Sequence, residues 1–106
     1  MNIKTWGINQ LKLVISILKE ISEDNNPKAD DYGIDSEKFW DIVEAMRDEG
    51  LIKEVMILRG GAGHKVTAAS LERAKITIKG MEYLHQNSVL VKTYKGLKEV
   101  REWLPF

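Results

Sequence analysis

A glycine-rich stretch with cationic residues at both ends is the part of this sequence best suited to chemistry with phosphate groups. Arg59 precedes it, His64 and Lys65 close it, and three of the four residues between them are glycine. Because glycine has no side chain, the backbone can approach a phosphate oxygen closely there. The residues predicted to contact DNA are Arg59, Gly61, His64, Lys65, Arg73 and Lys75.

The same stretch also suits a tight β-hairpin with ordinary solvated charges, since turn geometry alone favours glycine. It does not match a nucleotide-binding loop. Such a loop is followed by Lys-Ser/Thr and by the start of a helix, and neither follows Gly63 here. DNA contact and a plain hairpin are therefore the two interpretations of this segment.

The sequence offers little for metal binding or catalysis. His64 and His85 lack the spacing of metal ligands. No serine stands in a nucleophile-elbow motif. The chain has no cysteine, which excludes disulfides and thiolate zinc sites. We predict a protein that is not an enzyme and has no cofactor and no metal.

Charge is unevenly distributed along the 106 residues, although the net charge is zero. Residues 1–52 carry 6 Lys/Arg and 11 Asp/Glu, a balance of −5, and residues 53–106 carry the opposite balance of +5. A surface that faces phosphates is therefore expected in the second half of the chain.

The helix expected over residues 35–49 organises the chain. Asp35 is a good N-cap, because its carboxylate can accept from the free amides of the first turn. Ile34 and Phe39 are spaced as a hydrophobic staple. Gly50 can adopt the left-handed conformation that ends a helix in a Schellman motif, with Leu51 folding back onto Met46.

The exposed side of this helix is acidic, which bears on what it can bind. Its residues are Asp35, Glu37, Asp41, Glu44, Asp48 and Glu49, against Lys38 and Arg47. Phosphates would be repelled from such a face, so the remaining interpretations are a plain solvated face or a docking site for a basic partner. Trp40 would mark a protein contact if it were exposed.

The remaining elements follow from apolar spacing and turn residues. Residues 8–23 are expected to form a core helix, whose polar residues, Ser16 among them, fall within an arc of roughly 100°. The other expected elements are a short helical turn at 28–32, a strand at 51–58, a return strand at 65–68 and a helix over 77–86.

A final helix is expected over residues 88–104. Leu90, Leu97 and Leu104 recur every seven residues along it and predict a surface that packs on the domain or on a second copy of the chain. No apolar run is long enough to span a bilayer and no small-residue cleavage site is present, so we predict a cytoplasmic protein without a membrane partner.

This order of elements resembles a winged helix-turn-helix domain, an α+β fold, over residues 1–106 as one domain. The segments LKLVISILKEI, EKFWDIVEAMRDEGLI, ITIKGMEYL and TYKGLKEVREWL resemble, more narrowly, the YjcQ-like family of small bacterial and prophage proteins. The resemblance implies a winged-helix fold and, by analogy, DNA binding, and it implies no catalytic or ligand residues.

We therefore predict a winged-helix regulator or accessory protein of a phage or other mobile element. Its contact with duplex DNA is expected through the basic hairpin, and to be weak and salt-dependent. The alternative is a protein-interaction module or homodimer that uses helix 35–49 or helix 88–104 and does not bind DNA.

Overall fold

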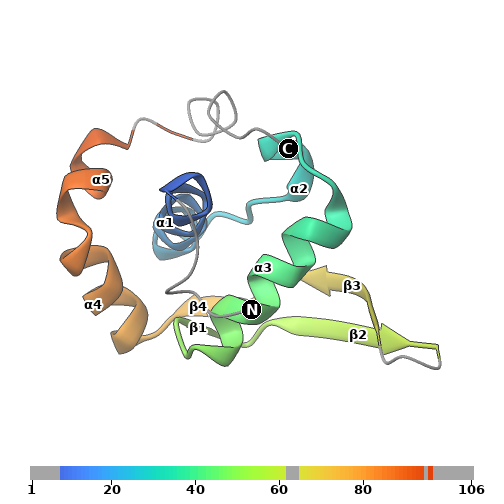
Figure 1. Cartoon of the computed structure of the whole chain (residues 1–106). Helices are drawn as coiled ribbons and strands as arrows, with labels where there is room; N and C mark the ends of the chain where they lie inside the picture. The colour runs from blue at the N-terminus through green and yellow to red at the C-terminus, as the bar shows by residue number, and fades with distance from the viewer. Residues whose placement is uncertain (1–7, 62–64, 95, 97–106) are drawn as a thin grey trace.

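A computed structural model describes residues 8–61, 65–94 and 96 (Figure 1). The helices are α1 (Ile8–Ser22), α2 (Ala29–Tyr32), α3 (Ser36–Asp48), α4 (Ile78–Gln86) and α5 (Ser88–Thr93). The strands are β1 (Ile52–Lys53), β2 (Met56–Gly60), β3 (Lys65–Ser70) and β4 (Lys75–Ile76). This confirms the α+β class, and the layout is compatible with a winged helix.

The central helix is α1, which lies between α2 and α3 on one side and α4 and α5 on the other (Figure 1). Its apolar side chains are buried in one core with residues of α2, α3 and β1, as its apolar circumference predicted. Five α1 residues belong to this core: Leu13, Val14, Ile17, Leu18 and Ile21.

The signals predicted at both ends of α3 are confirmed. The Asp35 side chain accepts a hydrogen bond from the Glu37 amide, and Phe39 is buried in the first turn. At the other end Gly50 has φ +77° and donates to the Arg47 carbonyl at 2.9 Å. The Leu51 amide donates to the Met46 carbonyl at 3.0 Å. These two bonds form a Schellman motif that stops the helix and turns the chain into β1.

The strand expected over residues 51–58 is divided in two. Glu54 has φ +59°, a left-handed conformation that ends β1 after Lys53 and redirects the chain into β2. β1 then pairs with β4, and β2 pairs with β3, both antiparallel. The β2–β3 hairpin, called the wing below, contains a register shift between Leu58 and Arg59.

A close junction joins the end of α3 to the start of α4. The Thr77 hydroxyl caps α4 by accepting from the Gly80 amide at 3.0 Å, and it donates to the Gly50 carbonyl at 2.5 Å. The Thr77 amide also donates to the Leu51 carbonyl at 3.1 Å. A Cβ on Gly80 would collide with the Leu51 carbonyl oxygen, so only glycine allows this approach.

A chain of buried hydroxyls corrects the prediction for Ser16. We placed Ser16 on the polar side of α1, but its side chain is 0% exposed. Its Oγ hydrogen-bonds the Tyr32 hydroxyl at 2.9 Å and the Tyr94 hydroxyl at 2.8 Å. The Tyr94 hydroxyl donates onward to Glu20 at 2.6 Å. Helical periodicity gives the direction of a side chain but not what packs over it.

The last helix is shorter than predicted. α5 ends at Thr93, and Tyr94 has an extended backbone with φ −69° and ψ 122°. Gly96 has φ +128°, which a helix does not accommodate. A helix that continues unbroken from Ser88 through these residues is therefore wrong. Leu97 and Leu104 lie outside the described residues.

Gly80→Ala is expected to lower the free energy of unfolding by about 2 kcal/mol or more, because the added methyl group has no space between Leu51 and Ile76. Urea denaturation followed by circular dichroism measures the change. Gly60→Ala is the matched control, since its Cβ would meet only the Thr67 methyl group at 3.4 Å. Equal stability of the two variants would contradict this account of the junction.

Ser16→Ala is expected to destabilise the protein by about 1–3 kcal/mol, because two tyrosine hydroxyls lose a buried partner. Tyr94→Phe alone is expected to cost about 1 kcal/mol. The double variant should lose less unfolding free energy than the two single variants lose together, since both substitutions remove the same hydrogen bond. Strict additivity in this double-mutant cycle would show that the hydroxyls are not coupled.

Stability is also expected to fall at alkaline pH. Burial raises the pKa of Tyr32 far above its ordinary value of about 10, and a weaker opposite effect comes from its bond to Ser16. As the pH rises, the Tyr32 hydroxyl therefore loses its proton in the unfolded chain before it does so in the folded one. Its contribution to the free energy of unfolding is complete below a pH of about 10 and declines above it. Tyr32→Phe is expected to reduce this decline, by up to about 1.4 kcal/mol per pH unit. Urea denaturation of the wild type and of Tyr32→Phe at several pH values below and above about 10 tests this prediction. It would be contradicted if the free energy of unfolding fell equally steeply with pH in both proteins.

Candidate functional site

The acidic face of α3 holds one of the cations predicted to contact DNA. Arg59 of β2 forms an ion pair with Glu44 of α3, and both side chains are partly exposed. The bond fastens the wing to α3 and occupies the Arg59 guanidinium. Asp41, Glu44 and Asp48, with Ala45, line a shallow hollow of about 240 Å³ on this helix, called the acidic hollow below.

The tip of the wing is described only in part. Gly61 is exposed with φ +76°, and a Cβ there would meet nothing within 4 Å, so its glycine serves the turn. His64 lies outside the described residues. Lys65 begins β3, and its side chain is not among those described. The prediction that these three residues contact DNA stays a prediction.

A second group of cations lies at the β1–β4 pair. Lys53 and Lys75 are directly opposite each other in the register, and both are exposed, whereas their neighbours Ile52 and Ile76 pack on the core. Residues opposite each other on antiparallel strands share a face of the sheet. Like charges in such positions repel, so this face attracts anions.

Two more exposed cations flank β4 in the sequence. Arg73 stands two residues before Lys75, and the stem of Lys79 passes within 3.6 Å of where a Cβ on Gly50 would lie. We call Lys53, Arg73, Lys75 and Lys79 the basic patch. Exposed carboxylates reduce the positive charge of this patch. Glu54 and Glu72 are next to it in sequence, and the Asp24 carboxylate is 3.6 Å from the Lys75 ammonium.

Among the described residues, the structure separates the predicted DNA-contacting positions into two groups. Arg73 and Lys75 follow the base of the wing, whereas Gly61 and Lys65 are at its tip (Figure 1). The five residues of β2 separate the two groups by about 16 Å at the usual rise of about 3.3 Å per residue. Lys53 and Lys79 were not among the predicted residues, because strand pairing and the α3–α4 junction place them.

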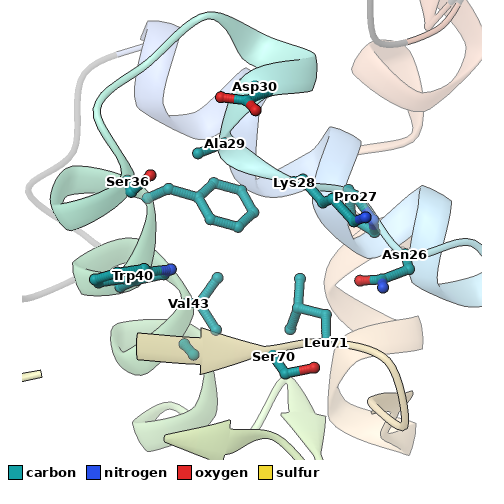
Figure 2. A pocket seen from close by; sticks show the side chains of 12 residues that line it. Asn26, Pro27, Lys28, Ala29, Asp30, Ser36, Trp40, Val43, Ser70 and Leu71 are labelled. Carbon is teal, nitrogen blue, oxygen red and sulfur yellow. The ribbon is translucent and has the colours of Figure 1, made fainter. Parts of the chain in front are cut away.

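The sequence also did not reveal a crevice beside α3. Figure 2 shows Val43 and Leu71 directed into it, with Trp40 on one side and Pro27 on the other. Its volume is about 210 Å³. Segments distant in sequence form it: residues 26–30, the first turns of α3, and residues 69–71 at and just after the end of β3. The only sequence signal was Trp40, which is half-buried at its edge.

The surface predicted for a dimer is represented by a single described residue. Leu90 is half-buried on α5. α5 and α4 with Lys19 of α1 enclose a shallow groove that includes Met81, Leu84 and Val91. Self-association through Leu90, Leu97 and Leu104 stays a prediction.

Two further observations concern metals and membranes. Among the residues that the structure describes, no three His, Cys, Asp or Glu side chains gather as metal ligands. In the same residues no helix is long and apolar enough to cross a membrane.

Comparison with known proteins identifies relatives by sequence. The model of a family described as YjcQ protein matches residues 10–103. The uncharacterized protein YjcQ of Bacillus subtilis (strain 168) is 33% identical over 100 residues, covering 92% of this chain and 99% of the relative. No solved structure matches the chain significantly. Because the family model spans most of the sequence and this relative aligns over nearly its whole length, the chain belongs to the YjcQ family.

Proposed function

We propose that this protein is a non-enzymatic winged-helix module, a small regulator or accessory protein that binds duplex DNA through the phosphate backbone. The observation that carries the proposal is the direct pairing of Lys53 with Lys75 on an exposed face. Two like charges held opposite each other lower stability, and the exposed Asp24 carboxylate, which pairs with only one of the two, Lys75, at 3.6 Å, offsets this only in part. A phosphate group supplies a further anion.

The surroundings of the pair favour DNA backbone over base recognition. Arg73 and Lys79 extend the positive surface, whereas the helix that enters the major groove in winged-helix domains is acidic here. Lysine binds phosphate as a point charge and reads no sequence. Binding is therefore weakly specific, with a dissociation constant of about 10⁻⁴–10⁻⁶ M at moderate salt.

Replacing both lysines tests the proposal by fluorescence anisotropy with a labelled duplex of mixed sequence. Lys53→Gln/Lys75→Gln is expected to weaken binding about fivefold to tenfold. It should also reduce the slope of log K against log salt by about 1.8, since each phosphate contact contributes about 0.9. Lys28→Gln/Lys92→Gln, two exposed lysines elsewhere, is the matched control for net charge.

Three outcomes would contradict the proposal. One is the absence of saturable binding by the wild-type protein at low salt. Another is an equal loss in both double variants, which would indicate general attraction rather than a site. The third is a loss confined to Lys65→Glu, which would place the contact at the tip of the wing instead of the basic patch.

A further inference from the structure

We propose that the crevice beside α3 is a docking site for a peptide segment of another protein, one that carries an aromatic or branched aliphatic side chain next to lysine or arginine. This surface is separate from the basic patch, and the inference does not depend on DNA binding. It gives a role to the acidic face of α3, which DNA cannot use.

The size of the crevice selects a single side chain. Its volume of about 210 Å³ exceeds the roughly 150 Å³ of an apolar cavity known to hold benzene. It is smaller than the pockets of about 300–1,000 Å³ that enclose cofactors and drug-sized ligands. The crevice therefore suits the anchor residue of a longer ligand.

The lining of the crevice is apolar at its floor and polar at its rim. Val43 and Leu71 point into the crevice (Figure 2). Together with Phe39, which also lines it, they are almost fully buried. Trp40 stands at the edge, and its indole N–H makes no hydrogen bond within the described part of the chain. That N–H can donate to a backbone carbonyl of the ligand once the indole is covered.

The charge next to the crevice selects the neighbours of the anchor. Asp41 directly follows Trp40, and the acidic hollow that it lines continues along the same helix to Asp48. Glu44, which lines the acidic hollow, stands four residues after Trp40 at the edge of the crevice. Residues four apart on a helix lie about 5–6 Å apart on one side of it, so the crevice and the acidic hollow are within reach of one short peptide. The Arg59 guanidinium already paired with Glu44 shows which kind of group this face accepts.

A peptide library displayed on phage and selected against the immobilised full chain tests the proposal. The selected peptides are expected to share an aromatic or branched aliphatic residue with Lys or Arg within about four positions. In ¹⁵N–¹H spectra, the synthetic peptide should shift the Trp40 indole signal and the amides of Ala69 and Ser70. Replacing its anchor by alanine should weaken binding at least about tenfold.

Two exposed positions on α3 provide variants that do not disturb the core. Ser36→Phe places a ring at the rim of the crevice and is expected to abolish peptide binding. Asp41→Lys is expected to weaken it about fivefold by charge alone. Glu82→Lys, the same charge change at an exposed site on α4, is the matched control and should bind as the wild type does.

Several results would overturn the proposal. These are a selection without a shared motif, selected peptides that are acidic or lack the anchor, and unchanged binding to both Ser36→Phe and Asp41→Lys. Free indole that shifts the same signals when no peptide does would indicate a small-molecule site instead. Duplex DNA that shifts them would assign the crevice to the DNA surface. Unchanged DNA affinity in the α3 variants would separate this docking site from the basic patch.

Discussion

The rest of the structure depends on one constraint, the close contact between the C-terminal end of α3 and the N-terminal end of α4. Gly50 ends α3, Thr77 bonds its carbonyl, and Gly80 lets the helix backbone approach Leu51 without a side chain between them. The β1–β4 pair lies between these two ends in sequence, so the same contacts fix its register. The strands that carry Lys53 and Lys75 are thus positioned by contacts of Gly50, Leu51, Thr77 and Gly80 rather than by the two lysine side chains.

The separation of charge along the chain becomes a separation of surfaces in the fold. α3 gathers carboxylates beside an apolar crevice, whereas the β1–β4 pair and its flanks gather cations. The Arg59–Glu44 ion pair, which belongs to neither the basic patch nor the crevice, links the wing to α3. A net charge of zero therefore conceals two surfaces suited to partners of opposite charge.

Features encoded by neighbouring residues were predictable, and features made by distant segments were not. The Asp35 cap and the Gly50 stop depend on a few adjacent residues, and the structure confirms both. The turn at Glu54 was missed because a left-handed glutamate has no signal in a strand pattern.

Tertiary packing accounts for the remaining differences. Helical periodicity puts Ser16 on the polar side of α1, because the tyrosines that cover it come from two other parts of the chain. The crevice was invisible for the same reason, since residues 26–30 and 69–71 meet only after folding. The sequence identifies Lys53 and Lys75 as cations. That they lie opposite each other is known only from the register in which β1 pairs with β4.

The hydroxyl chain through Ser16 also orders the events of synthesis. Its bond to Tyr32 spans 16 residues and can form as soon as the first helices have left the ribosome. Its bond to Tyr94 spans 78 residues and has to wait until Tyr94 itself has been synthesised. Loop closure over the longer span costs more entropy, though only logarithmically. A nascent chain therefore carries its core serine half-satisfied until α5 arrives, and a truncated product that lacks Tyr94 would keep that defect permanently.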